Sequence, residues 1–193
     1  YSILFLFSVV FIGFNINHKS VWFDEIFSLE LAKTTYKQIW TITADDVHPP
    51  LYYWMLKAFS QIFGYTISVS RFFSAIPIFL GIAMGYTHIR KLWSNKVAFY
   101  FMLLMLLHPA MHYPTYDIRM YSWALFFVLT TYIYAYKFLK NLDNKDLIVV
   151  LIFALLSAYT HYYALLAVAG IFLVLSILIY NKYLLRIDLG CRI

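Results

Sequence analysis

The sequence contains a single cysteine, Cys191, and this scarcity excludes two kinds of stabilisation. One cysteine cannot form an internal disulfide, and it cannot supply a cysteine-based metal site. Walker loops, GxGxxG motifs, nucleophile elbows and zinc signatures are also missing from the sequence. The chain therefore offers no covalent cross-link and no common cofactor fingerprint.

Charge is scarce as well. Charged residues make up 12% of the 193 residues, whereas 63% are hydrophobic and the mean hydropathy is +0.73. Soluble domains are about 25% charged and about 45–50% apolar, and one core of this size cannot hide so much apolar surface. The composition excludes a soluble globule. The net charge of +6 does not indicate nucleic acid, because the basic residues form short clusters between apolar runs.

Apolar stretches of spanning length are present instead, and they predict an all-α polytopic transmembrane bundle of about six spans. We expect one module over residues 1–193, with spans at 1–14, 71–88, 97–114, 119–138, 147–160 and 163–180. A cleaved signal peptide is the alternative for residues 1–14, although no small-x-small site follows them. Because the chain starts inside an apolar run and ends without a closing element, we expect a fragment.

Basic residues between the later spans predict the orientation by the positive-inside rule. Three clusters should be cytoplasmic: Arg90, Lys91 and Lys96; Lys137, Lys140 and Lys145; and Lys182, Arg186 and Arg192. The outer loop 15–70 should then be extracytoplasmic, with amphipathic helical spacing over 25–40. The apolar stretch 50–63 is short for a span, so we expect a juxtamembrane or re-entrant helix; a true span is the alternative.

Two neighbouring carboxylates follow the first span in the motif WFDE. Adjacent helical positions point about 100° apart, so the two side chains cannot share a face. Asp24 is the candidate general base for an acceptor hydroxyl, with Glu25 as its supporting partner. The alternative is an ordinary acidic helix start.

Two candidate phosphate-binding residues come next. His48 stands before Pro49-Pro50, a pair that directs the chain into a new helix. Arg71 opens an apolar span, where an arginine usually has a partner or a function, and phosphate suits its fork of donors. An interfacial helix start and a snorkelling arginine are the alternatives.

Polar residues also interrupt the later spans, where they could line the same cavity. The motif YDIRMY supplies Asp117, Arg119 and Tyr121, and THYY supplies His161 and Tyr162. His112, Tyr113 and Tyr116 would add an aromatic rim for a sugar, and simple loop or membrane-belt positions are the alternative. His108 and His112 have metal-like spacing, but no acidic third ligand stands beside them, so we predict no metal site.

Five motifs in this order, WFDE, HPPLYYW, an arginine opening a span, YDIRMY and THYY, resemble the GT-C membrane glycosyltransferases over residues 18–165. The similarity is to bacterial relatives of protein O-mannosyltransferases and lipid A aminoarabinose transferases. By motif, Asp24 falls on the catalytic acidic position and His48 on a His or Lys that contacts the lipid phosphate. Arg71 matches the arginine at the head of the next span, and Asp117 stands where many relatives have Glu.

The resemblance implies a polyprenyl-phosphate sugar donor, a lipid, glycan or protein acceptor with a free hydroxyl, and inversion at the sugar carbon. It implies an active site on the extracytoplasmic face of a bacterial plasma membrane, and no obligatory cofactor, although some relatives use a divalent metal. Relatives have further spans and often an outer soluble portion. A transporter or lipid flippase, and an inactive truncated fragment, are the alternative functions.

Overall fold

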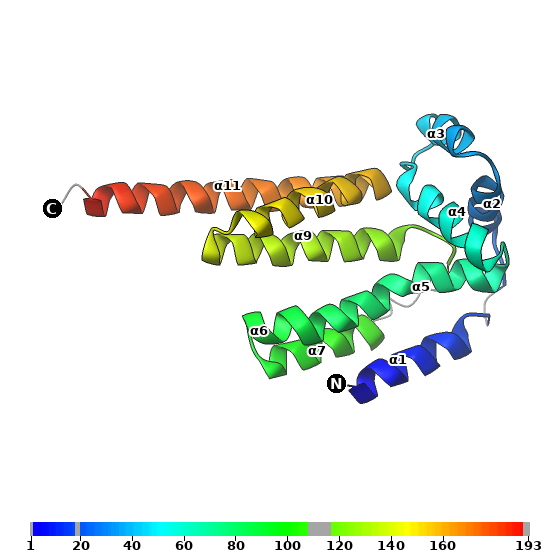
Figure 1. The fold of residues 1–193 in the computed structure, drawn as a ribbon, viewed down its shortest axis with the longest axis horizontal. Coiled ribbons are helices and arrows are strands. Elements are labelled where there is room, and N and C mark those ends of the chain that lie inside the picture. Colours follow the sequence, from blue (N-terminus) through cyan, green and yellow to red (C-terminus); the bar gives the residue numbers. More distant parts are fainter. Residues whose placement is uncertain (1, 18–19, 108–116, 191–193) are drawn as a thin grey trace.

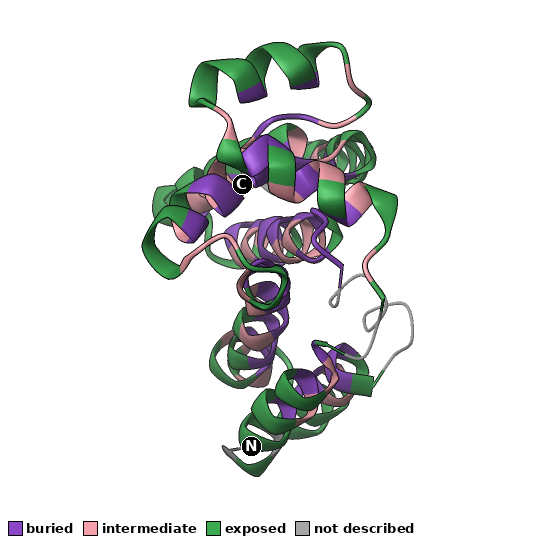
Figure 2. Ribbon diagram, turned by 90° about the vertical axis from the view of Figure 1, so that its right-hand side faces the viewer, coloured by how far each residue is buried: buried purple, intermediate pink, exposed green. Residues whose placement is uncertain are grey.

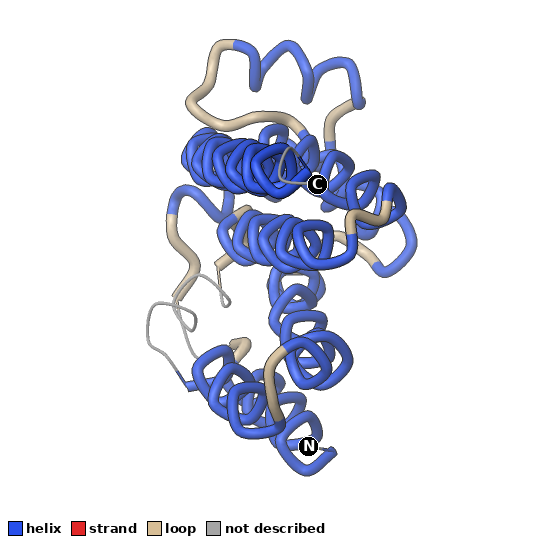
Figure 3. The backbone as a smooth tube through the Cα atoms, turned by 90° about the vertical axis from the view of Figure 1, so that its left-hand side faces the viewer, coloured by secondary structure: helices blue, strands red, loops and turns tan. Residues whose placement is uncertain are grey.

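The computed structural model describes residues 2–17, 20–107 and 117–190, and all regular structure in these ranges is helical. Figure 3 shows helices joined by short loops, and no strand occurs within the described ranges. The prediction of an all-α fold is confirmed. The helices are α1 (Ser2–Asn15), α2 (Phe23–Lys33), α3 (Tyr36–Ala44), α4 (Leu51–Phe63), α5 (Ile67–Met84), the π-helix η1 (Gly85–Ile89), α6 (Arg90–Leu92), α7 (Asn95–Leu107), α9 (Tyr121–Asn141), α10 (Asn144–Thr160) and α11 (Tyr162–Gly190).

Most of these helices run back and forth along one direction, and α2, α3 and α4 gather at one end of the bundle (Figure 1). Helices α5, α9 and α11 begin at that end, and α5 continues through η1 and α6 to the opposite end. The loops α6–α7 and α9–α10 lie at the opposite end. The helix ends that flank those loops carry two of the basic clusters, at the end of the bundle opposite α2, α3 and α4. That this end is cytoplasmic stays a prediction of the positive-inside rule.

Two helical stretches are long and apolar enough to cross a membrane: Ile67–Leu92, with mean hydropathy 1.7, and Tyr162–Lys182, with mean hydropathy 2.5. Phe5–Asn15 and Asn95–Leu107 are shorter apolar helices. Helices also cover the predicted spans 119–138 and 147–160, as α9 and α10, whereas the end of the predicted span 97–114 lies outside the described residues. The number of spans stays a prediction.

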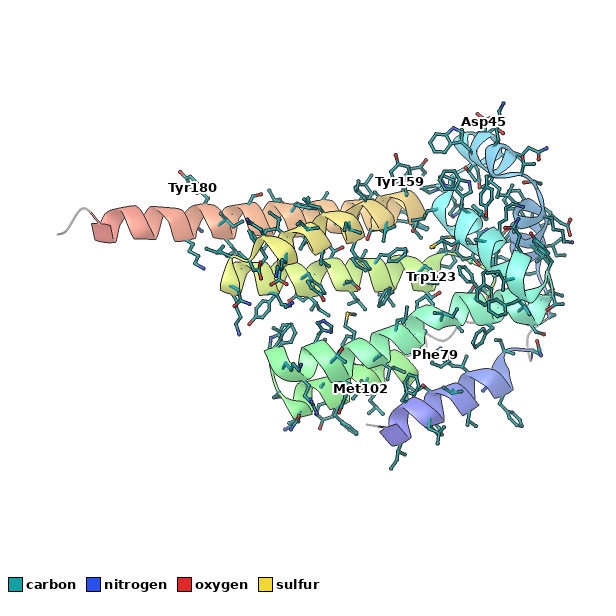
Figure 4. The ribbon with its side chains drawn as sticks, viewed as in Figure 1. Asp45, Phe79, Met102, Trp123, Tyr159 and Tyr180 are labelled. Carbon is teal, nitrogen blue, oxygen red and sulfur yellow. The ribbon has the colours of Figure 1, made fainter. Side chains whose placement is uncertain are left out.

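The outer surface of the bundle is strongly apolar. Figure 2 shows buried residues turned between the helices and exposed residues outward. Large hydrophobic side chains such as Phe14, Leu104 and Leu166 are among the exposed ones, and Tyr180 points away from α11 (Figure 4). Such a surface would aggregate in water, so lipid is its natural surrounding.

The segment 25–40 differs from the single amphipathic helix that its spacing predicts. The chain breaks at Thr34 and Thr35, which both have extended backbone, so that α2 and α3 are separate helices. Thr35 caps α3 through a capping box, in which its Oγ1 accepts from the Gln38 amide and the Gln38 side chain accepts from the Thr35 amide. The T-x-x-Q motif of Thr35 and Gln38 therefore begins a new helix within a segment whose apolar spacing is continuous.

Helix α4 connects the end of the bundle formed by α2, α3 and α4 to the packed core. Its residues Tyr52, Tyr53 and Leu56 are fully buried, and they belong to a cluster with Leu31 of α2 and Phe73 of α5. This packing holds α4 against α2 and α5 at the end where the candidate site lies. Whether residues 50–63 cross the membrane stays a prediction.

Candidate active site

A buried ion pair between α2 and α5 organises the site. Glu25 and Arg71 are 0% and 1% exposed. The Arg71 Nε donates to Glu25 Oε1 and its Nη2 to Glu25 Oε2, both at 2.8 Å. This two-pronged geometry is the strongest form of a charge-assisted hydrogen bond.

The same pair ties together two further parts of the chain. Arg71 Nη1 donates to the Ile16 carbonyl at 3.0 Å, and the Ile118 amide donates to Glu25 Oε1 at 3.1 Å. The end of α1, the first turn of α2, α5 and the segment before α9 therefore converge on one carboxylate and one guanidinium. In this structure the protein itself occupies the Arg71 fork that the sequence suggested for phosphate.

A second arginine, Arg119, links the two other key residues. Its Nη2 lies 3.6 Å from Asp24 Oδ2 and 3.2 Å from His48 Nε2. The Arg119 side chain is 5% exposed, whereas that of Asp24 is 35% exposed. Residues from α2, from the loop before α4 and from the segment before α9 thus meet around one cation.

His48 is oriented from both sides. Because Arg119 can only donate, His48 Nε2 accepts, and the neutral ring carries its proton on Nδ1. That nitrogen lies 3.7 Å from Asp46 Oδ2. The arrangement selects one tautomer and leaves the imidazole beside a cation that suits an anionic ligand.

Aromatic residues extend the polar cluster into a cavity. The His48 and His161 ring centroids are 5.3 Å apart, and those of Tyr121 and His161 are 5.6 Å apart. The Tyr163 amide donates to His161 Nδ1 at 3.1 Å, so the neutral His161 ring carries its proton on Nε2. These rings could stack on a sugar, as the aromatic motifs suggested.

The cavity has a volume of about 930 Å³, and its lining changes character along its length. His48, Tyr121, His161 and Tyr162 form its polar part, and side chains of α9 and α11 form its apolar walls: Ala124, Leu125, Val128, Ala164, Leu165 and Leu166. A further apolar cavity of about 470 Å³ lies between later turns of the same two helices. Such a site fits a ligand with a polar head and a hydrocarbon tail.

Both site histidines are neutral at physiological pH. Burial and the positive charge of Arg119 lower the pKa of His48, with Asp46 and Asp24 opposing this shift. Burial and Arg119 also lower the pKa of His161. A neutral His48 can accept from Arg119, and an anionic phosphate would favour its protonation.

These shifts predict how stability depends on pH. Below the ordinary histidine value of 6.5, the unfolded chain takes up protons that the folded protein resists. The free energy of unfolding should therefore fall as the pH falls from 6.5 toward the folded-state pKa values. Thermal unfolding in detergent between pH 7.5 and 5 measures this. The variant His48→Gln/His161→Gln should flatten the curve, and a curve parallel to that of the wild type would contradict the assignment.

The remaining candidate residues are placed as follows. Asp117 is 7% exposed, its carboxylate acts electrostatically on Arg71, and its carbonyl accepts from the Arg119 amide at 2.7 Å. It therefore lies on the Arg71 side of the site. His108, His112, Tyr113 and Tyr116 lie outside the described residues, and no cluster of three metal-ligating side chains occurs within those ranges.

Two residues of the site were not singled out from the sequence. Asp46 orients His48, and its position two residues before the histidine was the available signal. Tyr53 is buried near Arg119. In the sequence it stands among the aromatic residues of the motif HPPLYYW, which resemble ordinary membrane-belt positions. Only the packing of α4 against α2 reveals its proximity to the site.

A family model described as dolichyl-phosphate-mannose-protein mannosyltransferase matches residues 47–187. The match includes His48, Arg71, Asp117, Arg119, Tyr121, His161 and Tyr162, whereas Asp24 and Glu25 precede it. No curated protein and no solved structure matches the chain.

Proposed function

Since the chain belongs to the dolichyl-phosphate-mannose-protein mannosyltransferase family, we propose that it transfers a sugar from a polyprenyl-phosphate donor to an acceptor hydroxyl. The acceptor is a lipid, a glycan or a protein. The observation that carries this proposal is the cavity whose polar end holds His48 and His161 and whose walls become apolar along α9 and α11. A phosphate would sit at the polar end, with the polyprenyl chain along the apolar walls.

In this proposal the donor phosphate is held by His48 and Arg119. A polyprenyl phosphate is a good leaving group that needs charge stabilisation more than protonation. Arg119 supplies a permanent positive charge, and its Nη2 is already 3.2 Å from His48. Tyr121, His161 and Tyr162 would contact the sugar, because they line the same end of the cavity.

Asp24 is the proposed general base. Its carboxylate is the partly exposed one of the pair, while Glu25 is fully buried and bonded to Arg71. Asp24 would take the proton of the acceptor hydroxyl as that oxygen attacks the sugar carbon and the phosphate leaves from the opposite face. This single displacement inverts the anomeric carbon, by the logic of inverting glycoside chemistry.

Glu25, Arg71 and Asp117 have a supporting role in this proposal. Arg71 and Glu25 are buried and bonded to each other, and Asp117 lies on the Arg71 side. The pair would position Asp24, its sequence neighbour, and Arg119, which follows the Ile118 amide that Glu25 binds. No cofactor takes part in the proposed step.

The proposed site faces the extracytoplasmic side of the membrane. Two clusters of basic residues lie in the helix ends that flank the loops α6–α7 and α9–α10, at the opposite end of the bundle (Figure 1), and such clusters favour the cytoplasm. We also propose that the protein resides in a bacterial plasma membrane, because its motifs resemble those of bacterial family members.

The test is a transfer assay with membranes that contain the protein and a panel of polyprenyl-phosphate sugars, with and without a metal chelator. We expect transfer from at least one donor, unaffected by the chelator, and a product of inverted anomeric configuration. Retention would contradict the single displacement. Transfer from none of the donors would contradict the proposed glycosyltransferase activity. Movement of a lipid from one leaflet to the other in vesicles that contain the protein would then favour a flippase.

A further inference from the structure

Two hydrogen-bond donors at the site are buried and unused. Among the described side chains, four buried polar atoms make no hydrogen bond: Tyr53 Oη, Ser60 Oγ, Ser70 Oγ and Arg119 Nε. A buried donor without a partner is costly, so such atoms are rare and call for an explanation. Tyr53 and Arg119 are special among the four because they act on each other electrostatically beside Asp24.

Tyr53 faces the side of α2 that carries Asp24. Its ring packs edge-to-face against Phe27, with ring centroids 6.3 Å apart. Phe27 and Ser28 follow Asp24 by three and four residues, which places all three on one helix face. Ser28 Oγ donates to the Asp24 carbonyl at 2.8 Å. The tyrosine is thus held against the turn of helix from which the Asp24 side chain projects.

The Asp24 carboxylate makes no hydrogen bond to these donors in the structure. Its Oδ2 lies 3.6 Å from Arg119 Nη2, and its side chain is 35% exposed. A hydrogen-bonded ion pair has a separation of about 2.7–2.9 Å, so this pair is open. A small inward rotation of Asp24 would bring a carboxylate toward Arg119 and toward the buried hydroxyl behind it.

The neighbouring tyrosine provides a contrast. Tyr52 is equally buried, but its hydroxyl lies 2.8 Å from Ser74 Oγ and is therefore satisfied within the core. Burial raises the pKa of the Tyr53 hydroxyl, so Tyr53 is a neutral O–H donor at physiological pH. Both residues lie on α4. The Tyr52 hydroxyl has a full hydrogen bond, whereas the Tyr53 hydroxyl has the Ser28 side chain as a polar neighbour but makes no hydrogen bond of normal geometry.

We propose that Tyr53 is a positioning residue of the active site: when substrate binds, Asp24 closes inward and accepts hydrogen bonds from the Tyr53 hydroxyl and the Arg119 guanidinium. These donors would hold the carboxylate in one orientation toward the acceptor hydroxyl. The inference rests on the proposed role of Asp24 as base. His48 from the loop before α4 also interacts electrostatically with this carboxylate, and Asp46 and His161 in turn act on His48.

The consequence for catalysis has two parts. Loss of a hydrogen bond to a charged group should lower kcat about ten- to hundredfold, with little change in KM for the donor, because Tyr53 does not line the cavity. A carboxylate that loses a donor to its charged form also takes up a proton more easily. The acid limb of the pH–rate profile should therefore move to higher pH.

The experiment compares Tyr53→Phe with Tyr52→Phe as the matched control. We expect Tyr53→Phe to unfold at the wild-type temperature or higher in detergent without substrate, and to show reduced kcat with a shifted acid limb. Tyr52→Phe should be less stable, because it loses the bond to Ser74, and should keep the wild-type pH profile.

Each contrary result has one meaning. A loss of stability in Tyr53→Phe equal to that of Tyr52→Phe would show that its hydroxyl serves the fold, and would overturn the inference. Wild-type kcat and pH profile in Tyr53→Phe would overturn it as well, while leaving the proposed function intact. Absence of transfer by the wild type itself would overturn the proposed function, and this inference with it.

Discussion

Replacing Asp24 with asparagine should reduce sugar transfer by about 10²- to 10⁴-fold, the range that general base catalysis contributes. Asparagine keeps the size and the hydrogen-bonding shape of the side chain but cannot accept the proton of the acceptor hydroxyl. Donor binding should persist, because the cavity is lined by other residues, among them His48 and His161. The measurement is transfer of a labelled sugar alongside donor binding in the same membranes.

The matched control is Asp45→Asn. Asp45 is an exposed carboxylate at the end of α3, at the same end of the bundle as the site (Figure 4). The Arg119 guanidinium pairs with Asp24 and His48 rather than with Asp45. Its replacement should leave the rate unchanged. Equal rates for the wild type and Asp24→Asn would remove Asp24 as the base, and the carboxylate in the first turn of α2 would then serve only the helix start.

Breaking the ion pair between Glu25 and Arg71 should have the largest effect on stability. Removing one partner leaves an uncompensated charge in the interior, which costs about 3–5 kcal/mol. Glu25→Gln and Arg71→Met should each lower the free energy of unfolding by that order, because the two side chains are 0% and 1% exposed. Thermal and denaturant unfolding of the detergent-solubilised variants provide the measurement.

Two comparisons make this test specific. Glu30→Gln breaks an exposed pair with Lys33, whose side chains are 60% and 45% exposed, and should cost less than about 1 kcal/mol. The double variant Glu25→Gln/Arg71→Met should cost less than the sum of its single variants, since neither charge is left alone. Additive single effects, or losses no larger than that of Glu30→Gln, would show that the pair does not organise this end of the bundle.

The sequence alone was sufficient for the class of protein and for the family. Apolar runs over 71–88 and 163–180 predicted helices. The helical stretches Ile67–Leu92, which is α5 with η1 and α6, and Tyr162–Lys182 of α11 have enough length and hydropathy to span a membrane. The five ordered motifs resembled GT-C glycosyltransferases, and the family match over residues 47–187 confirms that membership. These properties are local, because a helix depends on neighbouring residues and a motif on short spacings.

Sequence reasoning was weaker wherever two local signals competed. The periodicity over 25–40 predicted one amphipathic helix, whereas the capping box at Thr35 and Gln38 divides the segment into α2 and α3. A cap satisfies backbone groups that would otherwise stay unpaired at a helix end. Apolar spacing continues across such a break, so periodicity alone does not detect it.

Which charges face which partners was decided only by the tertiary structure. The sequence predicted Asp24 as the base and Glu25 as its supporting partner. Only packing left Asp24 partly exposed and buried Glu25 against Arg71, 46 residues away. Arg119, rather than Arg71, came to lie beside both Asp24 and His48. The apolar composition alone was enough to predict membrane helices, because the insertion of a segment into lipid depends on the residues of that segment. The partner of a charged side chain depends on how distant helices pack, and no local pattern encodes that contact.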